Sequence, residues 1–274
     1  MTDSLECSRV RPDATGQIDA DMIAALSDAL LEARRTPGGT VDALPAGLSL
    51  PDDAAAYAVQ DAVARALWES AGPVVGWKVG AASPDATPFC APLHRATLFY
   101  SDTRLPPGLC RVFGVEAEIV YRIGRDLPFR TEGWDEAAVR DAIASAHPAI
   151  EIFDTRFPRP FQHARLIHLA DQGNHGALVI GEGITDWASL HPVTEPVRLI
   201  VDGAVRMAHR GGNSAGDPIR LLVWLANHAA ARGMPLKAGD VVTTGSMTGT
   251  EFVPAGTVVR VEFGSLAPVS VTMP

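Results

Sequence analysis

The sequence has few cysteines, no long apolar run and no basic cluster, and each absence excludes a class of protein. Three cysteines in 274 residues form no C-x-x-C pair, so neither a zinc site nor a disulfide framework is indicated, and we expect a reducing cytoplasm. No segment approaches the ~20 apolar residues of a membrane span, and the polar, acidic start lacks the plan of a signal peptide. A formal net charge of -9 argues against nucleic-acid and anionic-membrane partners.

Motifs of three familiar enzyme classes are also missing. The chain has no G-x-S-x-G, no H-E-x-x-H and no G-x-G-x-x-G, so nothing favours a hydrolase elbow, a zincin or a dinucleotide-binding fold. What the sequence does have is 47% hydrophobic residues and an ordinary charge content. It therefore encodes a globular protein, built as one large domain or as a small one plus a large one.

A strand with two carboxylates on one face is the most informative stretch. Alternation over residues 114–121 places Glu116 and Glu118 on one face and apolar side chains on the other. About thirty residues later, residues 148–154 form a second β-like stretch, which contains Glu151. If the two strands are neighbours, three carboxylates converge, and like charges tolerate this only around a cation. The alternative is a solvated acidic strand and an unrelated Glu151.

A lysine lies in another short β-like segment, residues 74–80. Trp77 and its apolar neighbours pack one way, whereas Lys78 faces the other way between Gly76 and Gly80. The glycines are expected to leave room beside the ammonium group. A lone lysine in a strand is otherwise usually a surface residue with its stem packed on the protein.

Two helices are expected before this segment. Residues 19–35 have the helical apolar period, and residues 49–53 supply capping chemistry for a second helix that runs to about residue 70. After a loose tail of about a dozen residues, these helices would form a small cap, so we place the domain boundary between residues 1–72 and 73–274.

The remainder mixes strands, helices and loops. We expect a long irregular connection over residues 81–111, a helix over 135–145 between the two glutamate strands, and a hairpin at Asp202-Gly203. A helix from Pro218 to Gly233 and strands near 240–244 and 257–263 follow. This order predicts an α+β or mixed-sheet fold. The turn at 171–175 and the Gly/Ser/Thr loop at 245–250 are typical of ligand-facing segments.

Several motifs together resemble one family. They are Gly76-Trp77-Lys78-Val79-Gly80, Gly114-Val115-Glu116-Ala117-Glu118, Ala149-Ile150-Glu151-Ile152-Phe153-Asp154, Leu169-Ala170-Asp171, and the run from Leu236 to Ser246. In this order and spacing they resemble the fumarylacetoacetate hydrolase superfamily. Within it they most resemble the branch of 2-keto-4-pentenoate hydratases and 4-oxalocrotonate decarboxylases.

The resemblance implies a mixed β-roll-like core with a small helical N-terminal cap, a homo-oligomer, and a small-molecule 2-oxo acid or dienol substrate. It implies Mg²⁺ or Mn²⁺ at Glu116, Glu118 and Glu151. It places Lys78 and Asp171 in the same pocket, with Lys78, Glu118, Glu151 and Asp171 as the catalytic candidates. Together with the two ligand-facing segments it makes Asn174, Gly245 and Ser246 the substrate-binding candidates.

The function implied first is metal-dependent hydration of a 2-hydroxy-2,4-dienoate to a 4-hydroxy-2-oxo acid in ring-cleavage catabolism. A decarboxylase of a 2-oxo-3-enedioate is the alternative, favoured if Arg95 or Arg111 binds a distal carboxylate. An acylpyruvate-type C-C hydrolase and a non-catalytic partner subunit are less favoured. His94 and His175 lie in two loops that depart from the branch's pattern, and for each a proton-transfer role and a plain binding or surface role are both open.

Overall fold

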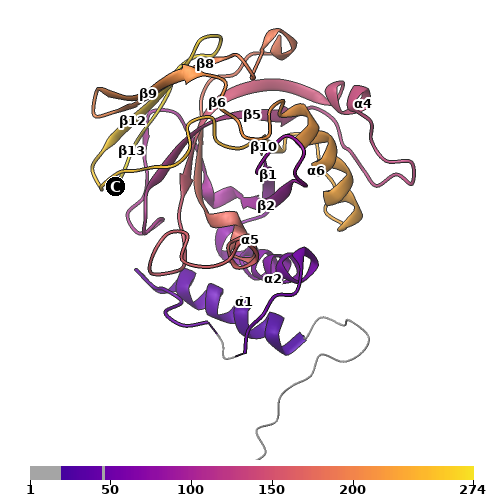
Figure 1. Ribbon diagram of the computed structural model, residues 1–274, viewed down its shortest axis with the longest axis vertical. Coiled ribbons are helices and arrows are strands. Elements are labelled where there is room, and N and C mark those ends of the chain that lie inside the picture. Colours follow the sequence, from indigo (N-terminus) through magenta and orange to yellow (C-terminus); the bar gives the residue numbers. More distant parts are fainter. Residues whose placement is uncertain (1–19, 45–46) are drawn as a thin grey trace, which may run out of the picture.

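Figure 1 shows the computed structural model of the chain, which describes residues 20–44 and 47–274. The expected N-terminal tail and Cys7 lie outside the described residues. The α-helices are α1 (Ala20–Arg35), α2 (Asp53–Ala66), α3 (Trp68–Ala71), α4 (Glu136–Arg140), α5 (Arg165–Ala170) and α6 (Ile219–Ala231). Short 3-10 segments are η1 (Arg95–Thr97), η2 (Gln172–Asn174) and η3 (Trp187–Ser189).

The strands form two sheets. The eight-stranded sheet has the order β2-β1-β10-β5-β6-β7-β3, with β11 paired to β5, and the five-stranded sheet has the order β4-β13-β12-β8-β9. The strands of the first sheet are β1 (Val74–Gly80), β2 (Phe89–His94), β3 (Leu98–Tyr100), β5 (Gly114–Ile123), β6 (Ile143–Phe153), β7 (His175–Ile180), β10 (Val241–Thr243) and β11 (Glu251–Phe252). Those of the second are β4 (Thr103–Arg104), β8 (Pro196–Val201), β9 (Ala204–Arg210), β12 (Val258–Phe263) and β13 (Val269–Thr272).

The arrangement confirms the α+β class with a mixed-sheet core. Strand β1 pairs in parallel with β10, whereas β10 and β5 are antiparallel. Strands β12 and β13 pack against β6, so apolar side chains of both sheets share one buried cluster. Helices α1 and α2 pack on each other below the sheets, and α2 packs on α5 (Figure 1). The domain boundary at residue 72 stays a prediction.

The longest strand pair, β5 with β6, positions the two glutamate stretches. It is antiparallel, with Glu116 opposite Glu151 and Glu118 opposite Ala149. Residues directly opposite in an antiparallel pair project to the same face. The register therefore brings all three predicted carboxylates to one face, as expected if the strands are neighbours.

The helix expected over residues 135–145 is wrong in its second half. Helix α4 ends at Arg140, and β6 begins at Ile143 opposite Ile123 of β5. Alanine favours helix locally, but Ala142 and Ala146 are both buried here, the first just before β6 and the second within it. Tertiary burial overrides a propensity of a few tenths of a kcal/mol per residue.

The irregular connection expected over residues 81–111 is also wrong, because it contains β2, β3 and β4. Strand β2 includes Pro92, which argued against a strand in the sequence. It forms the edge of the eight-stranded sheet and pairs only with β1, a place where a strand tolerates proline. A short helix, α5, and a last strand, β13, were likewise not expected.

Other expectations are confirmed. Asp202 and Gly203 both have positive φ and join β8 to β9 in a hairpin. Helix α6 follows Pro218 and ends before Gly233, and Leu221, Leu222 and Leu225 are buried. Among the described residues, no helix is both long and apolar enough to cross a membrane.

Candidate active site

Three glutamates from two neighbouring strands meet at one point. One carboxylate oxygen from each of Glu116, Glu118 and Glu151 lies within 4.8 Å of the others. Glu118 and Glu151 are almost completely buried, and Glu116 is half-buried. We call this cluster the glutamate triad.

Hydrogen-bond donors hold the triad's side chains in place. Glu118 accepts from the Thr243 hydroxyl and, at 2.9 Å, from the backbone N–H of Gly245. Glu116 accepts from the Thr250 hydroxyl. The loop between β10 and β11, which was expected to face a ligand's carboxylate, thus directs its donors to the protein's own glutamates.

The charges of the triad are unevenly compensated. Burial and the negative charge of Glu151 raise the pKa of Glu116. Burial and the negative charges of Glu151 and Glu116 raise the pKa of Glu118 well above its usual value. Burial also opposes ionisation of Glu151, but the Lys78 ammonium and His175 outweigh it and lower the pKa of Glu151. Three crowded carboxylates with one lysine therefore need further positive charge.

The triad fits a divalent cation by the chemistry of its donors. Its ligand set is all oxygen, as hard cations such as Mg²⁺ prefer. Glu151 Oε2 is buried and has no hydrogen-bond partner, so one inward oxygen stays free for coordination. An unpaired buried carboxylate oxygen is costly unless a cation binds it.

Lys78 reaches the triad from β1. Its Nζ lies 2.7 Å from Glu151 Oε1 and 3.0 Å from the carbonyl oxygen of Gly173, and its side chain is 13% exposed. The surface alternative for Lys78 is therefore wrong, and the structure brings this residue into the predicted site.

The glycines beside Lys78 have a different role from the one expected. A Cβ on Gly76 would lie 2.4 Å from the carbonyl oxygen of Val241, and one on Gly80 would lie 3.3 Å from the Phe89 ring. The space is already filled by neighbouring strands. These glycines permit close packing of β10 and β2 on β1 and do not leave room for a ligand.

His175, the first residue of β7, also contacts the triad. Its Nδ1 lies 3.1 Å from Glu151 Oε1, and its Nε2 lies 2.9 Å from the Thr97 hydroxyl. Burial outweighs the attraction of Glu151 and lowers the pKa of His175, which keeps the imidazole neutral. A neutral imidazole between a carboxylate and a hydroxyl can relay a proton.

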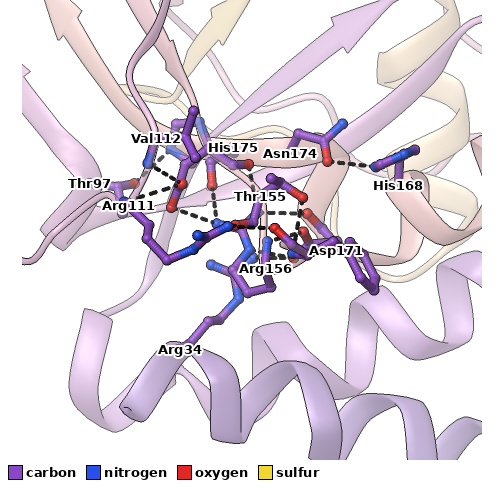
Figure 2. A network of polar contacts seen from close by, with 12 residues as sticks. Arg34, Thr97, Arg111, Val112, Thr155, Arg156, His168, Asp171, Asn174 and His175 are labelled. Carbon is purple, nitrogen blue, oxygen red and sulfur yellow. Dashed lines mark hydrogen bonds and ion pairs between the residues drawn. The ribbon is translucent and has the colours of Figure 1, made fainter. Parts of the chain in front are cut away.

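Asp171 belongs to a second cluster of charges, shown in Figure 2. Its carboxylate accepts from Arg156 Nε at 2.6 Å and from Arg34 Nη2 at 3.1 Å. Arg156 also binds the Asp154 carboxylate. We call these four residues the arginine network. The carboxylate of Asp171 is thus directed to two guanidinium groups. Lys78 instead donates to the backbone carbonyl of Gly173, two residues after Asp171.

The three predicted substrate contacts have protein partners. Asn174 Oδ1 lies 2.9 Å from His168 Nδ1, to the right of the network in Figure 2. The N–H of Gly245 donates to the Glu118 carboxylate, and the Ser246 hydroxyl donates to the carbonyl of Gly249. Only Gly245 is in direct contact with the triad, and substrate binding by the three stays a prediction.

The remaining candidates lie farther from the triad. Arg95 is exposed, whereas Arg111 donates to the backbone carbonyls of Thr155 and Phe157. His94 is buried with Nδ1 2.8 Å from the Gly72 carbonyl. These contacts assign none of them to the triad.

Sequence reasoning missed Thr243 and Thr250, which orient two of the three carboxylates, and Arg34 and Arg156, which hold Asp171. The two threonines had a signal, since Thr250 ends the Gly/Ser/Thr loop at 245–250 and Thr243 lies two residues before it. The arginines had none, because Arg34 lies 137 positions from Asp171 and only the packing of α1 brings them together.

The fold brings together a triad of carboxylates whose oxygen ligands fit a divalent cation. The model of the fumarylacetoacetate (FAA) hydrolase C-terminal family matches residues 79–273, more than half of the chain. The chain belongs to the fumarylacetoacetate hydrolase family.

Relatives within the family carry two kinds of name. The chain is 31% identical over 242 residues to a 2-keto-4-pentenoate hydratase of Burkholderia vietnamiensis, covering 84% of this chain and 88% of the relative. It is 30% identical over 158 residues to a 4-oxalocrotonate decarboxylase of a Pseudomonas species, covering 57% of this chain and 59% of the relative. The branch expected from the motifs is thereby confirmed.

A solved structure has the same fold. It is a 4-oxalocrotonate decarboxylase from Pseudomonas putida G7, complexed with magnesium and adipate, with a TM-score of 0.81 and 22% identity. The likeness covers 94% of this chain and 99% of that one. At this identity it shows the fold, and it confirms the predicted mixed core of the family.

Proposed function

We propose that the protein is a metal-dependent hydratase that adds water to a 2-hydroxy-2,4-dienoate of the 2-keto-4-pentenoate type and yields a 4-hydroxy-2-oxo acid. The observation that carries the proposal is the convergence of three glutamate oxygens within 4.8 Å beside Lys78. The relative that is matched over 84% of this chain is named as a hydratase of this type, which supports hydration as the reaction.

Each residue of the site has a proposed role. Glu116, Glu118 and Glu151 hold Mg²⁺ or Mn²⁺, the metals that suit an all-oxygen set. The bound cation supplies Lewis-acid stabilisation of negative charge on the 2-oxo group. Lys78 orients Glu151 and adds a second positive charge near that group, a role supported by its 2.7 Å contact and its burial.

The reaction requires proton transfers at defined carbons. The O2 proton of the dienol leaves and C5 gains one, which gives an unsaturated 2-oxo acid. Water then adds its oxygen at C4 and a proton reaches C3, so that one water is gained in total. Glu118 and Glu151 are the candidate bases, and the contact of Glu151 with His175 supports a route for protons away from Glu151.

Asp171 is better suited to a positioning role than to that of a base. Two arginines hold its carboxylate at 2.6 and 3.1 Å. Because Gly173 follows two residues later and accepts from Lys78, we propose that Asp171 fixes the turn that faces the lysine.

Decarboxylation of a 2-oxo-3-enedioate is the second candidate, supported by the 4-oxalocrotonate decarboxylases among the similar proteins. The same enolate would form by loss of CO₂ instead of by loss of a proton. This substrate has a second carboxylate, for which Arg95 and Arg111 are the candidates; Arg111 is half-buried and Arg95 is exposed.

The deciding experiment is a spectrophotometric assay of purified, metal-stripped protein with 2-hydroxypenta-2,4-dienoate and with 2-oxo-3-hexenedioate, run with and without Mg²⁺ or Mn²⁺ and coupled to CO₂ detection. Metal-dependent loss of dienol absorbance without CO₂ is expected. Release of CO₂ would move the function to the decarboxylase. If neither substrate reacts, with or without metal, the proposal is wrong.

Assembly and location complete the proposal. We propose that the enzyme is a cytoplasmic homo-oligomer. We also propose that its reaction belongs to ring-cleavage catabolism, which the names of its relatives support. Size-exclusion chromatography with light scattering tests the oligomer, and a monomeric mass would contradict it.

A further inference from the structure

A second cavity, of about 260 Å³, lies outside the glutamate triad. Helix α1, the end of β2, η1 and the segments around residues 108–111 and 154–156 contribute to its wall. The three glutamates and Lys78 do not line it. Its charged and polar side chains include those of Arg34, His94, Arg111, Asp154, Arg156, Gln172 and His175. His175 is the residue that faces both sites.

The cavity has positive charge with unused donors. Figure 2 shows the side chains of Arg34 and Arg111 converging on Arg156 from two different segments. Arg34 Nε and Arg111 Nε are both buried without a hydrogen-bond partner. Arg111 otherwise donates to backbone carbonyls, and among the described residues no carboxylate forms an ion pair with it. Its charge is therefore available to an anion.

The same cavity has unused acceptors. The Nδ1 atom of His94 lies 2.8 Å from the Gly72 carbonyl, which can only accept, so Nδ1 has the proton and Nε2 is an acceptor. Burial, aided by the charge of Arg34, lowers the pKa of His94 and keeps this neutral form. His94 Nε2 and Gln172 Oε1 are both buried and unpartnered. The four unpartnered atoms belong to side chains that line one cavity, whereas most buried polar groups have a partner.

Donors and acceptors together define the chemistry of a ligand. Two guanidinium N–H groups require an anionic oxygen acceptor, for which a carboxylate is the commonest partner. The two free acceptors require a hydrogen-bond donor on the same small molecule, and a hydroxyl group meets this need. A plain fatty acid satisfies the first pair only, and a neutral alcohol satisfies the second only.

We propose that this cavity is a second binding site, which takes a small hydroxy acid with its carboxylate toward Arg34 and Arg111 and its hydroxyl toward His94 or Gln172. The site is separate from the triad and goes beyond the proposed reaction. His175 connects the two, since Nε2 contacts Thr97 in the cavity wall while Nδ1 contacts Glu151.

The test is calorimetric titration of the full-length protein with lactate, with propanoate as the matched acid that lacks the hydroxyl. Lactate is expected to bind once per chain, equally with Mg²⁺ and with EDTA, and about tenfold more tightly than propanoate. Arg111→Gln should weaken lactate binding about tenfold or more, whereas Arg95→Gln, the same change at an exposed residue outside the cavity, should not.

Other outcomes overturn the proposal. They are the absence of saturable lactate binding, equal binding of lactate and propanoate, or an equal effect of the two arginine variants. Lactate binding that is lost in EDTA or in Glu118→Gln would assign the ligand to the triad instead. The comparison of the two acids uses the unaltered chain, so it decides the matter even if Arg111→Gln fails to fold. It also requires no catalytic activity, so its result is independent of the proposed reaction.

Discussion

Two buried clusters of charge lie side by side in this protein, and they differ in balance. In the glutamate triad, three carboxylates face one ammonium group, and Glu151 Oε2 has no partner. In the arginine network, Arg156 makes hydrogen bonds from its Nε, Nη1 and Nη2 atoms to Asp154, Asp171 and His175. Buried charge by itself therefore does not mark a functional site. What distinguishes the functional site here is buried charge that the protein's own groups do not compensate.

This difference separates two uses of buried ions. A balanced network mainly holds segments together, and here it connects α1, the end of β6 and the turn before β7. An imbalanced cluster stays unstable until something binds it. The arginine network should thus matter most to folding and the glutamate triad most to metal binding.

The largest effect is expected from Glu118→Gln in the triad. Replacing a residue that only orients a metal ligand already costs about 10–100-fold in metal affinity. Loss of a ligand itself should therefore weaken Mg²⁺ binding by more than about 100-fold and abolish metal-dependent activity. The fold should persist, because one of three repelling charges is removed. Calorimetry with Mg²⁺, an activity assay and a thermal melt measure this. Glu182→Gln, at an exposed residue, is the control, and unchanged activity in Glu118→Gln would remove the site.

The arginine network should respond in the opposite way. Arg156→Met leaves Asp154 buried without its ion-pair partner and leaves Asp171 with Arg34 alone, and breaking a buried ion pair costs about 3–5 kcal/mol. Urea unfolding measures the free energy of unfolding, with Arg159→Met at an exposed position as the matched control. A loss in Arg156→Met no larger than in the control would show that the network does not stabilise the fold.

A smaller effect on Mg²⁺ affinity is expected from Thr243, which donates a hydrogen bond to Glu118 of the triad. Thr243→Val removes the hydroxyl that orients Glu118 and should lower Mg²⁺ affinity by about 10–100-fold. Thr244→Val is the control, because it makes the same change at the neighbouring residue, whose hydroxyl donates to the backbone carbonyl of Ile119. Titration with Mg²⁺ should distinguish the two variants. Equal affinities would contradict an orienting role for Thr243.

The smallest effect is expected at the surface. Arg165 pairs with Asp53 between α5 and α2, with side chains 61% and 39% exposed. Exposed ion pairs contribute about 0–1 kcal/mol, so Arg165→Gln should hardly change the free energy of unfolding, and salt should reduce the effect further. A loss similar to that of Arg156→Met would mean that exposure does not explain the difference between the pairs.

Local patterns predicted the parts of the site that lie within single elements. The alternation in β5 put Glu116 and Glu118 on one face, and Asp202-Gly203 identified the hairpin of β8 and β9. Patterns failed where a partner decided the outcome. Residues 143–145 were expected to end a helix but pair along β5. Pro92 lies in a strand because only one edge of β2 is paired.

The sequence by itself determined the chemistry of this protein: its family motifs, two carboxylates on one strand face, a lysine in a strand, and no cluster of basic residues. These follow from side-chain period and composition, which act over a few residues. Only the tertiary structure decided that Glu151 completes the triad, that Asp171 binds Arg34 and Arg156, and that four side chains with unpartnered polar atoms line one cavity. Such meetings depend on strand register and helix packing, and these are set by burial over the whole chain.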